Sequence, residues 1–294
     1  DSSATDALFK LALSGKVPPD QAIEAALVAL QSFEAQGDRS GQASSLLLLQ
    51  GVYREMGQYH TSLKYVKTGL ALVGRSGLLD QRIWNGQRSR SLFLAEAGQT
   101  YLLMDQIDSA ELYTDSAVAE NELINGSTWN FPVYLLGTIQ TIKGRTIEAE
   151  NNLRKAYTLA IQNNLAYDTL QIYSGMSTLF RKMGKPDSCL KYAQMVVRPG
   201  YRTTEIKNLL ESVDNLIYVH RLNGNKDSIL KYLDFKILVR DSLMSIEQDR
   251  KILQITFNEH MKEQEIENRQ RAYRNKVKQY SLAAGLIGLA LFSF

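Results

Sequence analysis

The residue types that most often carry out catalysis are few and widely separated in this chain. Its three histidines, His60, His220 and His260, are far apart, and none has the spacing of a zinc-binding helix. No glycine-rich phosphate loop and no Gly-x-Ser-x-Gly nucleophile elbow occurs. The single cysteine, Cys189, cannot build a disulfide framework, and we interpret it as a packed thiol. The sequence therefore offers no catalytic residues and no ligand set for a metal or cofactor.

Two arginines have a spacing that could recognise a ligand. Arg181 and Arg221 each stand three residues before a glycine. Two tyrosines also precede such glycines, Tyr134 by ten residues and Tyr218 by six. A guanidinium can hold a carboxylate through two parallel hydrogen bonds, so these arginines would suit an acidic peptide or a chain terminus. The alternative is that both arginines are simply solvated on the surface of a helix.

A pattern repeated around tight turns predicts the elements that carry these arginines. Within Leu49–Leu72, the turn residue Gly57 is followed by a small residue five positions later, Ser62, and by another twelve positions later, Gly69. Four further turns follow, at Asp105, Gly144, Gly184 and Gly224, with spacings of 48, 39, 40 and 40 residues. A period of this length is typical of a repeated helical hairpin.

Small side chains at the two positions after the turn would let antiparallel helices cross closely. Later repeats place there the pairs Ala110 and Ala117, Ala149 and Ala156, Cys189 and Val196, and Ile229 and Lys236. The last pair is not small, which predicts a terminal capping hairpin. The residue four before each turn is often aromatic, as at Tyr53, Tyr101 and Phe180, and we expect it to pack under the next hairpin.

This pattern resembles the tetratricopeptide repeat family, in a version with long helices. The resemblance covers Ala4 to Lys236, and the first hairpin is recognised by Ala22 and Ala29 in its second helix. It implies an all-α fold, in which residues 1–236 form a right-handed superhelical solenoid of about six helical hairpins.

In this repeat type the first helix of each hairpin lines the concave wall, with residues three, six, ten and thirteen before the turn pointing inwards. A peptide or protein is the expected ligand. The candidate ligand-binding residues are Arg54, Gln99, Tyr134, Thr138, Gln171, Ser174, Thr178, Arg181, Asp214, Tyr218 and Arg221.

Helical character continues after the repeats end. Residues 237–279 are expected to form a long connecting helix, since no Gly or Pro occurs from Ile237 to Tyr280, and this helix could pair with that of a second copy in a homodimer. Residues 280–294 then become apolar, and we interpret them as the start of a transmembrane helix. The alternative is a hydrophobic helix packed onto the repeats.

The order of repeats, long helix and membrane segment resembles the bacterial membrane-anchored tetratricopeptide sensor proteins, in which a transmembrane helix leads to a histidine kinase. Phe257–Glu267 and Ala272–Tyr280 are similar to the helix that precedes the membrane in that group. The resemblance implies the sensory domain of a two-component system, with the signal passing through the C-terminal helix. The alternatives are a membrane-tethered or cytoplasmic scaffold without kinase output, and the sensor part of a helix-turn-helix transcription regulator.

Charge and the first residue bear on the partners and on localisation. The net charge of +3 is small and scattered, which argues against nucleic acid as a partner of these residues. The chain begins with Asp1, which is consistent with a removed signal peptide and equally with a sequence that was shortened. Together with the resemblance, this leads us to expect a single-pass membrane protein whose repeats are periplasmic. Basic residues between Asn268 and Tyr280 favour the opposite placement, with the repeats in the cytoplasm.

Overall fold

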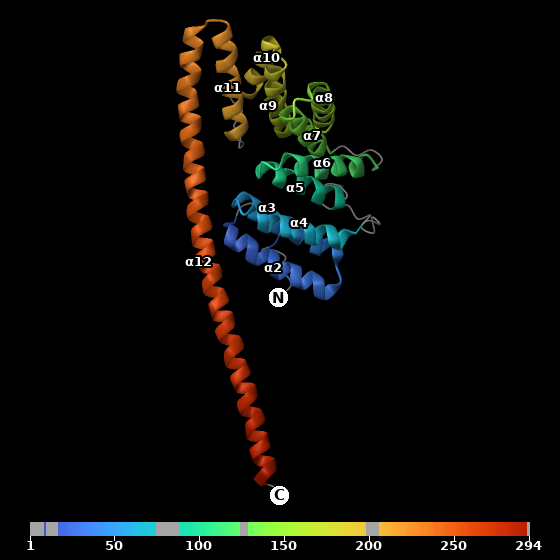
Figure 1. The fold of residues 1–294 in the computed structure, drawn as a ribbon, viewed down its shortest axis with the longest axis vertical. Coiled ribbons are helices and arrows are strands. Elements are labelled where there is room, and N and C mark those ends of the chain that lie inside the picture. The colour runs from blue at the N-terminus through green and yellow to red at the C-terminus, as the bar shows by residue number, and fades with distance from the viewer. Residues whose placement is uncertain (1–8, 10–16, 75–88, 124–128, 198–205, 293–294) are drawn as a thin grey trace. The chain divides into compact units, whose positions relative to one another are not determined.

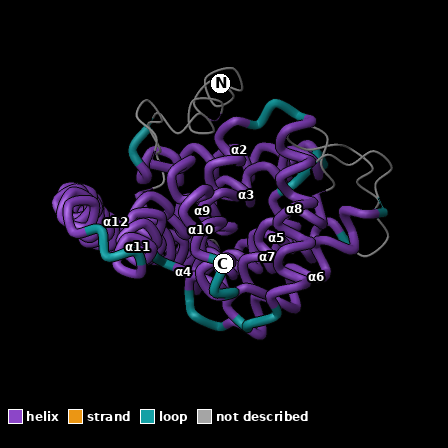
Figure 2. The backbone as a smooth tube through the Cα atoms, turned by 90° about the horizontal axis from the view of Figure 1, so that it is seen from above, coloured by secondary structure: helices purple, strands orange, loops and turns teal. Residues whose placement is uncertain are grey.

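The computed structural model describes residues 9, 17–74, 89–123, 129–197 and 206–292, and the regular structure of these residues is entirely helical (Figure 2). The helices are α2 (Pro19–Gln36), α3 (Arg39–Glu55), α4 (Tyr59–Val73), α5 (Ser89–Leu103), α6 (Ile107–Glu122), α7 (Phe131–Ile142), α8 (Thr146–Gln162), α9 (Ala166–Lys182), α10 (Pro186–Val197), α11 (Ile206–Leu222) and α12 (Lys226–Phe292). The predicted all-α fold is confirmed. The helix expected before Pro19 lies almost wholly outside the described residues.

Contacts divide the chain into two units, Asp1–Ser245 and Ile246–Phe294. In the first unit, each helix from α2 to α10 packs against the next helix in the sequence (Figure 1). The first helices of successive hairpins, α3, α5, α7, α9 and α11, also contact one another in order. The first unit is therefore a stack of helical hairpins with a row of first helices, as the repeat pattern predicted.

The predicted turns share one backbone conformation. Gly57, Gly144, Gly184 and Gly224 have φ between 66° and 78°, and Asp105 adopts φ 59° at the equivalent turn. At Gly57 the amide bonds to the Arg54 carbonyl, and the following amide of Gln58 bonds to the Tyr53 carbonyl. This is the Schellman arrangement, which closes the C-terminus of a helix and needs a left-handed residue. Asp105 fills this position because aspartate tolerates the left-handed region better than most residues.

The small positions lie in tight helix contacts. Ser62, Ala110, Ala149 and Cys189 are all fully buried. A Cβ added to Gly69 would lie 2.2 Å from the Phe93 ring of α5, so the next hairpin leaves no room for a side chain at this position. Burial raises the pKa of the Cys189 thiol, which agrees with its interpretation as a packed core residue.

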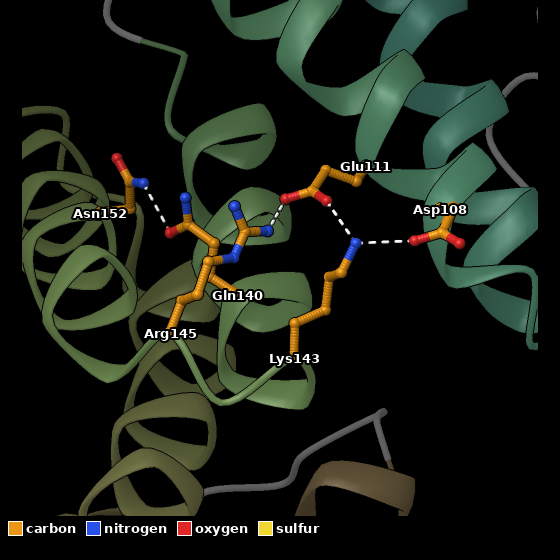
Figure 3. A network of polar contacts seen from close by, with 6 residues as sticks. All are labelled: Asp108, Glu111, Gln140, Lys143, Arg145 and Asn152. Carbon is orange, nitrogen blue, oxygen red and sulfur yellow. Dashed lines mark hydrogen bonds and ion pairs between the residues drawn. The ribbon is translucent and has the colours of Figure 1, made fainter.

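The residue four before each turn pairs with the residue twelve positions later, on the second helix of its own hairpin. The ring centroids are 5.4 Å apart for Tyr53 and Tyr65, 5.2 Å for Tyr101 and Tyr113, 5.5 Å for Phe180 and Tyr192, and 5.5 Å for His220 and Tyr232. In the remaining hairpin, Asn152 donates a hydrogen bond of 2.8 Å to Gln140 (Figure 3). We expected these residues to pack under the next hairpin. Their stacking partners instead lie within the same hairpin, so that expectation described only part of their contacts.

Tyr101 shows that the neighbouring hairpin contributes as well. It packs against a cluster that contains Leu135 and Ile139 of α7. One side chain thus joins both helices of its own hairpin to the next.

An ion-pair network secures the turn between α7 and α8 to α6. Lys143 lies 2.7 Å from carboxylate oxygens of both Asp108 and Glu111, and Arg145 pairs with the other oxygen of Glu111 (Figure 3). The hydrogen bond from Lys143 holds the pKa of the Asp108 carboxyl below its usual value. These charges serve the contact between neighbouring hairpins.

Helix α12 differs from the predicted organisation because it has no boundary at Lys236. The second helix of the last hairpin and the predicted connecting helix form one continuous helix of 67 residues. On the part of α12 that could pair with a second copy, Tyr273 is 71% and Val277 is 48% exposed. The side chains of Ile246, Leu253, Phe257 and Ile266 lie outside the described residues.

The predicted transmembrane segment at residues 280–294 has helical backbone as far as Phe292. Its apolar side chains from Leu282 onwards lie outside the described residues. In the part of the chain that the structure describes, no helix combines the length and the apolar character needed to cross a membrane.

Candidate functional site

A cleft of about 660 Å³ lies between α9 and α11, the first helices of the last two hairpins of the first unit. Arg181 and Thr178 reach it from α9, and Asp214 and Tyr218 reach it from α11. All four were predicted from their spacing to the turns, and the structure brings them together. The complete lining is Thr178, Arg181, Lys182, Lys207, Leu210, Glu211, Asp214, Asn215 and Tyr218.

Two contacts with α11 orient the guanidinium of Arg181 in the lining of this cleft. Its carbon lies 4.6 Å from the centroid of the Tyr218 ring, and one of its terminal nitrogens donates a hydrogen bond of 3.2 Å to the Asn215 side-chain oxygen. Both partners are uncharged, and no carboxylate of the described residues lies within ion-pair distance of Arg181. The contact with the Tyr218 ring and the hydrogen bond to Asn215 orient the guanidinium, and its positive charge stays available to a ligand.

The two carboxylates of the cleft are engaged by the protein. Glu211 accepts a hydrogen bond of 2.7 Å from Thr178, and Asp214 lies 2.6 Å from the ammonium of Lys236 on α12. Lys182 donates to the Thr141 carbonyl, at the C-terminal end of α7, over 2.9 Å. The lining therefore holds three cations and two acids, and one of the acids is already paired with a lysine from outside the lining.

Buried polar side chains join α9 to α11 behind the cleft. Asn215 donates hydrogen bonds of 3.0 Å to both Ser177 and Thr178. Ser212 bonds to Ser174 over 3.2 Å, and both serines are fully buried. Ser174 was predicted to point into the groove, but it lies inside the contact between the two helices. Its hydroxyl is used to dock the last hairpin, so it is not open to a ligand.

The other predicted site residues are spread along the row of first helices. Arg54 on α3 forms an ion pair with Glu96 on α5, with side chains 17% and 15% exposed. Thr138 donates to the Tyr134 carbonyl within α7, over 3.0 Å. Gln99, Tyr134 and Gln171 are half-buried on α5, α7 and α9, and they are not part of the cleft lining.

Arg221 is exposed in the last turn of α11, but it does not line the cleft. The predicted pair of arginines is therefore reduced to Arg181. The other cations of the cleft are Lys182 on α9 and Lys207 at the other end of α11.

Sequence reasoning missed Lys182, Lys207, Leu210 and Asn215 as members of the candidate site. The inward count includes Glu211, thirteen positions before Gly224, although Glu211 was not among the candidate residues. Lys207 lies seventeen positions before Gly224, where the inward spacing continues for one further helical turn. It could have been found by extending the count. Asn215 had no such signal, because its position is apolar or a glycine in the two preceding first helices, at Leu135 and Gly175.

The described residues contain no cluster of three or more His, Cys, Asp or Glu side chains that could hold a metal ion. The chemistry that the cleft can perform is recognition of an anionic group by its exposed cations.

Comparison with known proteins extends the description of the fold. No protein-family model and no curated protein matches the chain. Among solved structures, it is similar to BtubC, named BKLC, from P. vanneervenii, with a TM-score of 0.59 and 11% identity over 77% of this chain and 92% of that one. It is also similar to a kinesin light chain from Podospora anserina with nearly identical TPR-like repeats. The TM-score is 0.50 and the identity 15%, over 70% of this chain and 98% of that one.

A Rap protein complexed with Competence and Sporulation Factor gives a TM-score of 0.52 and 17% identity, over 83% of this chain and 69% of that one. At these identities the likeness concerns the fold. The described hairpins of this chain form a tetratricopeptide-like repeat domain.

Proposed function

We propose that the repeat domain is a protein-interaction module that binds an acidic segment of a peptide or protein in the cleft between α9 and α11. The observation that carries the proposal is Arg181, whose guanidinium is oriented by Tyr218 and Asn215 without a carboxylate partner among the described residues. Lys207 adds an exposed cation from the α11 side of the cleft. A Rap protein of similar fold was solved in complex with a factor, which supports a ligand-binding role for such a stack of hairpins.

Binding of an acidic ligand follows from the balance of charge around the cleft. Asp214 is paired with Lys236, and Glu211 is held by Thr178, while Arg181 keeps its charge towards solvent. A charge-assisted hydrogen bond contributes roughly 1.5–3 kcal/mol, more than a neutral one. A ligand with successive carboxylates could engage Arg181 and Lys207 together.

The test measures binding of a fluorescent hexaglutamate peptide to the 294-residue chain, with hexalysine as the comparison. The wild type should prefer hexaglutamate, and binding should weaken as salt is added. Replacing Arg181 by Ala should weaken hexaglutamate binding about tenfold or more. The matched control is Arg221→Ala, which removes an equivalent arginine outside the lining and should change binding less than about twofold.

Equal binding by wild type and Arg181→Ala, or a preference for hexalysine, would contradict the proposal. Melting curves of both variants show whether a loss of binding reflects a loss of folding.

We also propose that this module is the sensory part of a membrane-anchored bacterial signalling protein with a histidine kinase as its output. The proposal rests on the sequence resemblance, and it is supported by the continuity of α12 with the last hairpin. Because one uninterrupted helix carries residues of both units, a change at the last hairpin has a covalent path along it. Membrane attachment of residues 280–294, a periplasmic position of the repeats and pairing of two copies through residues 237–280 belong to the same proposal.

The natural gene product should then sediment with membranes and acquire phosphohistidine when it is incubated with ATP. A product found with membranes but without kinase activity would favour the tethered scaffold. A soluble product that binds partners would favour the adaptor, and sequence-specific DNA binding would favour the helix-turn-helix regulator.

A further inference from the structure

The ion pair between Asp214 and Lys236 occupies two positions that hold uncharged residues in the other hairpins and form an apolar helix contact in the third. Asp214 lies ten residues before its turn and Lys236 twelve residues after it. The same two positions hold Leu47 with Gly69 in the second hairpin. They hold Ala95 with Ala117 in the third, where both alanines are fully buried in one apolar cluster. The last hairpin therefore replaces a packing contact by a pair of charges.

This pair is half-exposed and opens onto the candidate site. The side chains of Lys236 and Asp214 are 33% and 39% exposed, and Asp214 is one of the residues that line the cleft. Lys236 does not line the cleft, yet it lies 2.6 Å from one of the two carboxylates that do. The charge that an incoming anion meets at Asp214 thus depends on a residue of α12.

We propose that Lys236 is a specificity-determining residue of the cleft, and that it couples binding of an acidic ligand to the docking of α12 on α11. The inference rests on the proposed function of the cleft. When Lys236 is docked it cancels the charge of Asp214, and the lining presents its cations. When Lys236 is undocked, Asp214 repels an anion. An acidic ligand therefore binds the docked arrangement more tightly and, by linkage, stabilises it.

A capping hairpin also needs solvated side chains at its outer positions, and that requirement would be met by any polar pair. The observation that favours a ligand role is the orientation of the pair. The acid belongs to the cleft, while the lysine belongs to the helix that continues out of the repeat unit.

The experiment measures hexaglutamate binding to three variants of the 294-residue chain. Lys236→Met keeps the length of the side chain and leaves Asp214 unpaired, so binding should weaken about threefold to tenfold. Adding Asp214→Asn to Lys236→Met removes the repelling charge and should return binding to within about twofold of the wild type. The matched control is Lys231→Met, an exposed lysine of the same helix that should leave binding unchanged.

Amide hydrogen exchange gives a second readout of the coupling. Hexaglutamate should slow exchange in residues 226–245 of the wild type, and this protection should be smaller in Lys236→Met. Unchanged binding by Lys236→Met, or a double variant that binds no better than Lys236→Met, would overturn the inference. The binding function would still stand if Arg181→Ala weakens binding as expected. Failure of the wild type to bind hexaglutamate would overturn both.

Discussion

Arg54 and Arg181 occupy the same position in two hairpins, three residues before the turn, but they meet different neighbours. Arg54 forms an ion pair with Glu96, and Arg181 bonds to Asn215; both partners lie nine residues before the turn of the next hairpin. Glu96 compensates the charge of Arg54, whereas the uncharged Asn215 orients Arg181 and leaves its positive charge uncompensated. A single change of residue type in the next repeat thus separates a structural contact from a candidate binding group.

The largest effect should come from a substitution that gives Arg181 the same kind of partner as Arg54. Asn215→Asp would give Arg181 the carboxylate partner that Arg54 already has. We expect hexaglutamate binding to fall more than about tenfold, because the new acid competes for the guanidinium and adds negative charge to the cleft.

Because Asn215→Asp also removes the donor to Ser177 and Thr178, melting curves are needed to separate a loss of binding from a loss of folding. Asn208→Asp on the same helix is a control for added charge alone. Tight hexaglutamate binding by Asn215→Asp would mean that Arg181 is not the anchoring group.

The reverse exchange tests the structural role of Arg54. Glu96→Gln leaves a charged arginine largely buried with a neutral partner, and it should lower the free energy of unfolding by about 1–3 kcal/mol. Urea denaturation measures this loss. No gain in hexaglutamate binding is expected, because the Arg54 side chain is only 17% exposed.

The control for that exchange is Glu150→Gln, which removes the half-buried partner of the exposed Arg154 within α8 and should cost less than about 0.5 kcal/mol. If both variants lose the same stability, the ion pair between Arg54 and Glu96 is no more than a surface contact.

Alkaline pH should destabilise the hairpin of Tyr53 before the hairpin of Phe180, and this effect is expected to be smaller than the two above. Burial, together with neighbouring Tyr65, raises the pKa of Tyr53 to about 12, and the equivalent residue before Arg181 is Phe180, which does not ionise. The neutral phenol is favoured in the folded state, so its contribution to stability is complete below about pH 10 and declines as pH rises towards 12.

Amide exchange around α3 and α4 should therefore rise in this pH range before exchange around α9 and α10. Tyr53→Phe should move the rise to higher pH. Parallel loss of protection in both regions, in the wild type and in the variant, would contradict this assignment.

Much of the fold follows from local sequence signals. The turns at Gly57, Gly144 and Gly184 need a left-handed residue, and the small residues that follow at fixed spacing become buried helix contacts. Asp105 was assigned as a turn from its spacing alone, and its positive φ agrees with that assignment. These signals are readable because each depends on one residue and its own helix.

The candidate site could be predicted only in part. Spacing placed Thr178, Arg181, Asp214 and Tyr218 on one face, and the structure places them around one cleft. It also placed Ser174 and Arg221 on that face, although Ser174 is buried against α11 and Arg221 does not line the cleft. A count along one helix gives a direction, and it contains no information on how closely the next helix approaches.

The sequence by itself determined the hairpins, their turns and the face of each first helix, since backbone conformation and helical periodicity are local properties. Only the tertiary structure decided that Arg54 is neutralised while Arg181 is available, and that Lys236 reaches Asp214. The physical reason is that the free energy of a charge depends on the groups within a few ångströms of it. In a stack of hairpins, the groups that orient Arg181 belong to the next repeat, 34 positions away in the chain for Asn215.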